Sequence, residues 1–304
     1  MKAIIRRQLE LPGLPSASGI EILGSTAYII GDDSPYLYCL DLQNLAITDR
    51  VTLFETTEFA AGRIPKLRKP DLECLTALTA PTGETGLLLC GSGATPAREV
   101  GYWVELAAGS RAATVRPLAL GSLYAALRQA LPAGVTLNLE AAAASAEELL
   151  LFQRTVGSIE GNLVFRLPLA AAWDFLMGTT TQLPAIRPQH FPLPTIDGRP
   201  AGFSGATIFQ NQLFITASVE DTQDAVADGA VLGSFVGVLT LTAPNQPAES
   251  VSLTRLELPD GQPYRGKVES IAVARLLAPG QWEVILVTDD DAGGSTAVVV
   301  ELGA

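Results

Sequence analysis

The sequence is poor in charged and aromatic side chains. Of its 304 residues, 17% are charged and 6% are aromatic, whereas 48% are hydrophobic. Disordered chains show the opposite balance, with few hydrophobic residues and many charges, so this composition excludes intrinsic disorder. Clefts that bind sugars usually expose aromatic rings, and their scarcity here disfavours a carbohydrate-active site.

Positive charge is also scarce. Lysine and arginine total 20 against 32 aspartates and glutamates, which gives a formal net charge of −12. Because an acidic protein repels phosphate backbones and anionic lipid surfaces, we expect neither a nucleic-acid partner nor a membrane partner. The partner expected instead is a small-molecule ligand or substrate, possibly a phosphorylated one, bound by a monomer.

Long apolar runs are absent. No segment approaches the roughly 18 consecutive apolar residues that a membrane-spanning helix requires. Basic Lys2, Arg6 and Arg7 are not followed by the apolar segment of a signal peptide. The expected location is the cytoplasm, or a secreted or periplasmic one if a leader has been trimmed.

Histidine and cysteine are too few for the sites they commonly build. The single histidine, His190, has no serine near it in sequence with which to form a Ser-His-Asp site. Three cysteines, Cys39, Cys74 and Cys90, are odd in number and lack the spacing of metal ligands. We interpret them as small buried hydrophobic residues in a reducing compartment.

What the sequence does contain is one pattern repeated five times. Each copy begins with a polar residue, here called the anchor residue, then a small residue and a short apolar run. Successive anchors are 55, 67, 64 and 65 residues apart. The five anchor residues are Ser18, Glu73, Glu140, Ser204 and Glu269.

Two further apolar segments follow each anchor, and both have the length and composition of β-strands. Three strands repeated about every 60 residues are typical of a propeller whose blades are antiparallel sheets. Candidate fourth strands lie at 46–54, 113–120, 186–193 and 251–258. The last copy runs out of chain, and the segment Ala3–Leu11 can supply its missing outer strand and close the ring.

The sequence therefore predicts an all-β protein with a single domain over residues 1–304. It is a five-bladed β-propeller with four-stranded antiparallel blades, closed by the N-terminal strand. The expected blades are 16–70, 71–135, 136–200, 201–264, and 265–304 together with 1–14.

A few segments depart from the strand pattern. The stretch Glu140–Leu151 (EAAAASAEELLL) has helical propensity, but register with the other copies predicts two strands there. Short helices are expected at Gly121–Leu131, with Ser122 as the N-cap, and at Pro168–Met177. The segment Glu220–Ser234 is predicted to be an acidic loop inside the fourth blade.

The first strand of each propeller blade lines the central channel, so the anchor residues should form a ring around the axis. Three carboxylates on one axis repel each other and lose hydration unless something compensates them. A hard cation such as Ca²⁺, which takes six to eight oxygens at about 2.3–2.6 Å, suits glutamates and serine hydroxyls. The alternative is a metal-free channel in which these groups bond backbone amides and water.

At this point the residues resemble a known family. The order Ser, Glu, Glu, Ser, Glu, one per blade, is similar to that of the calcium-activated nucleotidases (the apyrase family). Local matches are Ser18–Tyr38 with its Asp-Asp turn, Gly202-Phe-Ser204 and Lys267-Val-Glu269-Ser-Ile. Phytase-like propellers show a weaker similarity. The resemblance implies an axial Ca²⁺ bound by all five anchor residues, and hydrolysis of phosphoric esters or anhydrides.

The chain lacks several of the cationic residues that are typical of the family. An Asp-Asp-Arg turn is replaced by Asp32-Asp33-Ser34, paired arginines by Gln153-Arg154, and a lysine is missing from Ala217-Ser218-Val219-Glu220. Arg154 remains the best anion clamp, because a guanidinium binds phosphate or carboxylate through two bonds, and Arg98 could assist it.

Two function classes follow. In the enzyme hypothesis, Ca²⁺ neutralises the substrate and activates water while Glu140 or Asp32 acts as base. The predicted substrate contacts are Arg154, Ser92, Arg98, Ser218, Glu220 and Asp289. In the alternative, the cation is structural and the rim loops of a non-catalytic propeller bind a small ligand or a protein.

Overall fold

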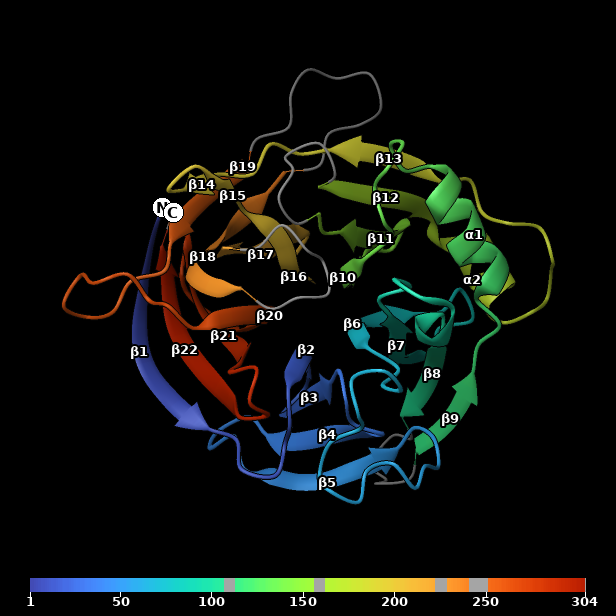
Figure 1. The fold of residues 1–304 in the computed structure, drawn as a ribbon, viewed down its shortest axis with the longest axis horizontal. Coiled ribbons are helices and arrows are strands. Elements are labelled where there is room, and N and C mark those ends of the chain that lie inside the picture. The colour runs from blue at the N-terminus through green and yellow to red at the C-terminus, as the bar shows by residue number, and fades with distance from the viewer. Residues whose placement is uncertain (107–112, 156–161, 222–228, 241–250, 304) are drawn as a thin grey trace.

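The computed structural model describes residues 1–106, 113–155, 162–221, 229–240 and 251–303. Its strands form five four-stranded antiparallel sheets arranged as blades around a central axis (Figure 1). Blade 1 contains β2 (Ala17–Leu23), β3 (Thr26–Gly31), β4 (Tyr36–Asp41) and β5 (Ile47–Thr52). Blade 2 contains β6 (Leu72–Thr79), β7 (Thr85–Gly91), β8 (Gly101–Leu106) and β9 (Ala113–Pro117). The five-bladed propeller expected from the repeats is confirmed.

The other three blades follow the same order, from the inner strand outward. Blade 3 contains β10 (Leu139–Ala144), β11 (Glu148–Gln153), β12 (Leu163–Pro168) and β13 (Arg187–His190). Blade 4 contains β16 (Gly202–Phe209), β17 (Gln212–Asp221), β18 (Ala230–Leu239) and β19 (Val251–Arg255). Blade 5 contains β20 (Lys267–Ala278), β21 (Gln281–Asp289), β22 (Ser295–Gly303) and β1 (Lys2–Glu10).

The N-terminal strand closes the ring, as predicted. Strand β1 pairs antiparallel with β22, from Lys2 opposite Gly303 to Glu10 opposite Thr296. This pairing places the two chain ends side by side (Figure 1). Because β1 covers the edge of β22, the last blade does not expose that edge to other chains.

The hydrophobic core is divided among the five blade interfaces. Five clusters of buried side chains occur, and each combines residues of two neighbouring blades. Between blades 1 and 2, for example, Ile30 and Leu37 pack with Leu75 and Leu89. Burying both faces of each blade in this way holds the inner strands at fixed positions around the axis.

The segment Glu140–Leu151 forms strands β10 and β11 in spite of its helical propensity. Its alternate side chains are buried in different interfaces, Ala142 between blades 2 and 3 and Ala143 between blades 3 and 4. Packing on both faces therefore outweighs local preference.

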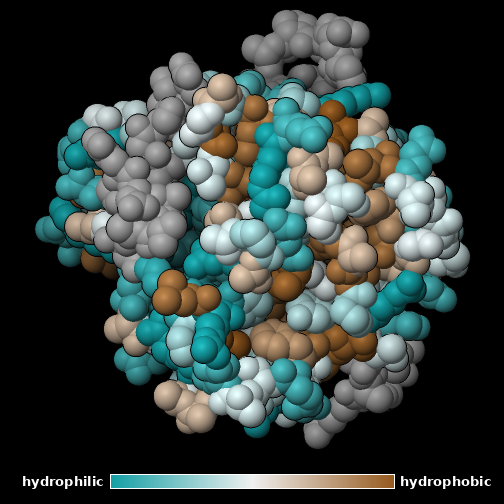
Figure 2. All heavy atoms as spheres, turned by 45° about the vertical axis from the view of Figure 1, so that its right-hand side comes forward, coloured by the Kyte–Doolittle hydropathy of each residue, from teal (hydrophilic) through white to brown (hydrophobic). Residues whose placement is uncertain are grey.

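Both expected helices are present. Helix α1 (Gly121–Gln129) and helix α2 (Leu169–Leu176) pack against blades 2 and 3. There the rings of Trp103 and Trp173 pack edge to face, with their centroids 4.9 Å apart. Figure 2 turns this side of the molecule forward and shows hydrophobic and hydrophilic residues interspersed over it. No helix among the described residues is long and apolar enough to cross a membrane.

Some local predictions were wrong. Ser122 is not an N-cap, because the helix begins one residue earlier after Leu120, which makes no side-chain capping bond. Most of the described part of the predicted loop Glu220–Ser234 is strand, since β17 continues to Asp221 and β18 starts at Ala230. Residues 222–228 of that loop, and Leu241 of the predicted third strand, lie outside the described residues.

Two small elements were not foreseen. One is a 3₁₀ turn, η1 (Pro96–Arg98), and the other is a hairpin of β14 (Thr195–Ile196) and β15 (Arg199–Pro200). The hairpin turns at Asp197-Gly198, both with positive φ, and an Asp-Gly pair is a strong sequence signal for such a turn.

Candidate functional site

The anchor residues occupy one equivalent position in all five blades, at a β-bulge. In blade 1, Ala17 lies opposite Gly31 and Gly19 lies opposite Ile30, so the pairing skips Ser18. Glu73, Glu140, Ser204 and Glu269 are skipped in the same way. A bulge re-aims the side chain of the extra residue, and five equivalent bulges put the anchors at the same level of the inner strands.

The same registers align two more sets of positions. One set lies at or near the end of the second strand of each blade and consists of Asp32, Ser92, Arg154, Ser218 and Asp289, as the sequence suggested. The other set lies two residues before each anchor and is Ser16, Asp71, Asn138, Gly202 and Lys267. The sequence analysis did not select this second set, although its constant offset from the anchors was a usable signal.

A cavity of about 470 Å³ lies where these sets meet, here called the axial cavity. Nine carboxylates and six cationic side chains line it, a formal excess of three negative charges if all are ionised. The carboxylates are Asp32, Asp33, Asp71, Glu73, Glu140, Glu220, Glu269, Asp289 and Asp291. The cations are Arg63, Lys66, Lys69, Arg98, Arg154 and Lys267.

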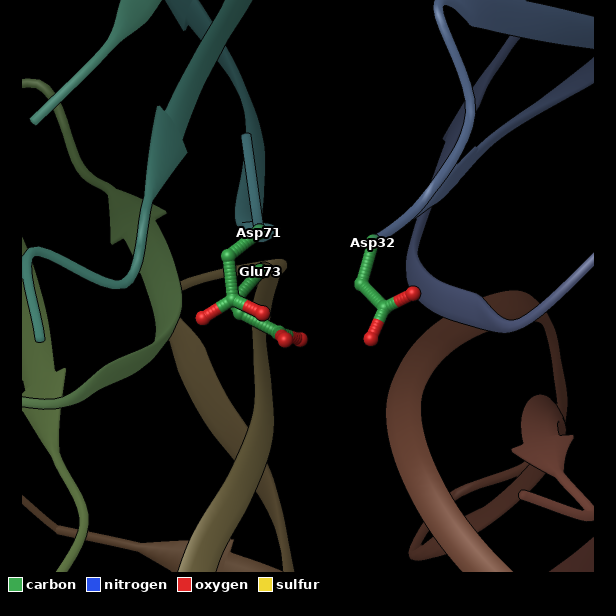
Figure 3. Close-up of side chains that lie close together, drawn as sticks. All are labelled: Asp32, Asp71 and Glu73. Carbon is green, nitrogen blue, oxygen red and sulfur yellow. The ribbon is translucent and has the colours of Figure 1, made fainter. Parts of the chain in front are cut away.

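Three of these carboxylates form a cluster that could hold a metal ion. Asp32, Asp71 and Glu73 each offer an oxygen, and the three oxygens lie within 4.8 Å of one another. Figure 3 shows Asp32, which follows β3, facing Asp71 and Glu73 at the start of β6. Elsewhere in the described residues, no other set of three acidic, histidine or cysteine side chains meets this distance criterion.

An ammonium group already lies in this carboxylate cluster. Lys69, in the connection between β5 and β6, bonds Asp32 and places its Nζ 2.9 Å from Asp71 Oδ1. Arg98 donates to the other oxygen of Asp71 at 2.7 Å. Lys69 and Asp71 were both missed by the sequence analysis.

Blades 3, 4 and 5 contribute a second group of ion pairs. Arg154 donates to Glu140 Oε2 at 3.3 Å and to Glu220. Lys267 Nζ lies 3.1 Å from both Glu269 Oε1 and Asp291 Oδ1. The Arg154 guanidinium, predicted as an anion clamp, is thus held between two carboxylates of the same chain.

The predicted serines bind the propeller itself. The Ser18 hydroxyl lines the cavity and donates to the carbonyl of Leu72 at 2.6 Å, which joins blades 1 and 2. Ser204 donates to Thr216, and Ser218 donates to the carbonyl of Val268 at 2.7 Å. Ser92 donates to Asp71 at 2.5 Å. Ser92, Ser204 and Ser218 lie behind the cavity lining, whereas the other predicted site residues line it.

Burial weakens the acidity of several cavity carboxyls. It raises the pKa of Asp32 to about 6, and those of Glu140 and Asp289 to about 7. For Asp32 and Glu140, a paired cation opposes this rise, whereas nearby carboxylates add to it. Burial, followed by Asp71 and Glu140, also raises the pKa of Glu73 well above its ordinary value. Carboxyls that titrate near neutral pH are suited to proton transfer.

Several carboxylate oxygens of residues that line the cavity have no partner among the described residues. Glu73 makes no hydrogen bond or ion pair there, and one buried oxygen each of Asp32 and Asp33 accepts no hydrogen bond. In contrast, Arg63, Lys69, Arg98, Arg154 and Lys267 are all ion-paired. The cavity is therefore short of positive charge and of hydrogen-bond donors.

The chain belongs to a family of unknown function (DUF6929), whose model matches residues 13–302. No curated protein matches the sequence.

Solved structures with similar folds are distant in sequence. The Cps50 (Swd1) β-propeller domain of Myceliophteria thermophila is 8% identical, with 96% of this chain and 99% of that chain covered at a TM-score of 0.42. The arabinanase Arb43A of Bacillus subtilis is 11% identical, with 96% of this chain and 95% of that chain covered at a TM-score of 0.40. Drosophila Semaphorin 1a, extracellular domains 1-2, is 11% identical, with 92% of this chain and 52% of that chain covered at a TM-score of 0.36.

Proposed function

We propose that this member of the family binds a small polar molecule in the axial cavity together with a divalent cation, for which Ca²⁺ is the best candidate. The observation that carries the proposal is the imbalance of the cavity, where the groups lacking partners are carboxylate oxygens. Keeping a buried carboxylate charged without compensation is costly, which is why burial raises the pKa of Glu73, and a bound cation would offset that cost.

The donor set fits a hard cation. Asp32, Asp71 and Glu73 offer only oxygens, and the cavity that they line has room for water. Ca²⁺ accepts carboxylates and water in loose geometry, whereas zinc prefers histidine and cysteine. In this proposal the cation lies between blades 1 and 2, to one side of the ring of all five anchors expected from the sequence.

The axial cavity is much larger than an ion. Its volume of 470 Å³ falls within the range of about 300–1,000 Å³ that is common for small-molecule sites. Arg63 lies at its edge with 41% of its side chain exposed and bonds only Asp33 and Ser16 among the described residues. An anionic group of the ligand could contact this guanidinium while the cation neutralises the carboxylate cluster.

Cation binding can be tested through thermal unfolding. We expect added Ca²⁺ to raise the melting temperature of the chelated protein, because a ligand that binds only the folded state stabilises it, by about 2.7 kcal/mol at one hundred times Kd. Asp32→Asn and Glu73→Gln should abolish the shift. Glu84→Gln, which removes an exposed carboxylate of the β6–β7 turn, is the matched control and should keep it. An equal shift in wild type and in Asp32→Asn would refute the site.

Hydrolysis of phosphoric esters or anhydrides is a second candidate function. It is favoured by the carboxyls with a pKa of about 7, of which Glu140 is held in place by Arg154 and Asn138. Beside a bound cation, such a group could take a proton from an attacking water.

The test of this second candidate is release of phosphate from nucleotides, sugar phosphates and phytate with Ca²⁺ present. Activity that a chelator removes and that Glu140→Gln lowers by about 10²-fold or more would support it. Activity unchanged in Glu140→Gln would exclude Glu140 as the base.

A further inference from the structure

We propose that Lys69 is a built-in cation that occupies the divalent-cation site and must be displaced when an ion binds. This inference rests on the proposed function and names how that site is controlled. Its consequence is that the ion and an anionic ligand bind cooperatively, since the displaced ammonium then needs a new partner.

The geometry places the ammonium and the ion in the same space. Lys69 Nζ bonds Asp32 and lies 2.9 Å from Asp71 Oδ1, and only 13% of the lysine side chain is exposed. The cluster oxygens lie within 4.8 Å of one another, close to twice the usual Ca²⁺–oxygen distance of about 2.3–2.6 Å. An ion bound to Asp32 and Asp71 would therefore lie where Nζ now is.

The ammonium leaves the site only partly neutralised. It contacts two of the three carboxylates, while Glu73 keeps no ion pair and Asp32 Oδ1 is buried without a hydrogen bond. A divalent ion carries twice the charge and can bind all three side chains. Lys69 thus stabilises the carboxylates of the cation-free protein, but it supplies less charge and contacts fewer of them than a divalent ion would.

Displacement determines what else the cavity binds. Lys69 is tethered to the cavity wall, so its released ammonium stays near the ion, where a phosphate or carboxylate group could contact both. A ligand that pairs with the displaced lysine makes ion binding easier, and the ion must favour that ligand by the same factor.

Blade 5 offers a matched control. Lys267 lines the same cavity with the same 13% exposure and pairs with Glu269 and Asp291. Its carboxylates are not part of the cluster that could hold a metal ion. Lys69→Met and Lys267→Met each remove one positive charge from the cavity, so a difference between them reports position and not overall charge.

The experiment is calorimetric titration of Ca²⁺ into wild type and both variants, with and without inorganic phosphate kept below its precipitation limit. We expect Lys69→Met to bind Ca²⁺ at least about tenfold more tightly than Lys267→Met, a difference of about 1.4 kcal/mol. Phosphate should strengthen Ca²⁺ binding in wild type and Lys267→Met by a larger factor than in Lys69→Met, because the variant lacks the displaced ammonium as a partner for the anion. Equal Ca²⁺ affinities in the two variants would overturn the proposal.

The outcomes separate this inference from the proposed function. If wild type binds Ca²⁺ and Asp32→Asn does not, but Lys69→Met behaves like Lys267→Met, only the role of Lys69 is wrong. If neither wild type nor Lys69→Met binds Ca²⁺, the cation site and this inference both fail. Should Lys69→Met not fold, Lys69→Gln, which keeps a hydrogen-bond donor without the charge, takes its place in the same comparison.

Discussion

At the scale of single residues, the buried cations of the cavity support its carboxylates. Arg154 is 6% exposed and lies between Glu140 and Glu220. Removing one partner of such a buried pair costs about 3–5 kcal/mol, since it leaves an uncompensated charge. We therefore regard Arg154 as a residue that positions Glu140, and Arg63 as the more accessible contact for an anionic ligand.

Glu21 is a buried carboxyl that sequence reasoning did not single out. It accepts backbone hydrogen bonds from Ile22 and from Ala77 in the next blade, and it lies 3.5 Å from the hydroxyl of Thr207 in blade 4. Blades 1 and 4 are not neighbours, so Glu21 spans the channel. Burial raises its pKa from 4.5 to about 7, against the hydrogen bonds that lower it.

This pKa predicts a specific pH dependence of stability. Because the folded state holds its proton more tightly than the unfolded state, the free energy of unfolding should fall as pH rises from 4.5 to about 7 and then level off. The loss should reach about 3 kcal/mol, from 1.36 kcal/mol per pKa unit. Denaturant unfolding of wild type and Glu21→Gln from pH 4.5 to 8 measures it.

The comparison isolates Glu21 from the cavity carboxyls that titrate in the same direction. Asp32, Glu140 and Asp289 remain in both proteins, so the difference between the two profiles belongs to position 21. The decline in wild type should exceed that in Glu21→Gln, whatever the absolute stability of the variant. Parallel profiles would mean that Glu21 titrates normally in the folded protein.

At the scale of secondary-structure elements, the fold could be predicted because the blades repeat. The polar anchor followed by apolar strands recurs five times, and this register gave the correct strands even at Glu140–Leu151. The bulges that hold the anchors were not predictable, since a bulge depends on how two strands pair. The prediction of Ser122 as the N-cap was wrong because the helix begins at Gly121, after Leu120, which makes no capping bond.

The site was predictable to a smaller degree, for a related reason. The anchors and the positions near the ends of the second strands could be aligned across the repeats, and most of them line the cavity. Lys69 could not be found in this way, because it comes from the β5–β6 connection, which lies outside the repeated strands. Asp71 is intermediate between these cases. It lies two residues before its anchor, as its equivalents do in the other blades, so it could have been aligned, but its positive φ of 54° could not be foreseen.

At the scale of the whole molecule, the charge distribution supports a ligand site on the axis. The chain has a net charge of −12, yet six of its 20 lysines and arginines line one cavity. Ring closure by β1 and the five blade interfaces fix the strands that carry these groups. Oxygens without partners in so rigid a frame suit a site that is formed before its ligand arrives.

The most direct test of a divalent cation in this cavity is a pair of crystal structures, one with chelator and one with Ca²⁺, examined by anomalous scattering. Our account predicts a calcium peak bound by Asp32, Asp71 and Glu73 in the second crystal, with the Lys69 ammonium moved out of the cluster. A crystal at saturating Ca²⁺ that shows Lys69 still bonded to Asp32 and Asp71, and no peak among these carboxylates, would contradict it.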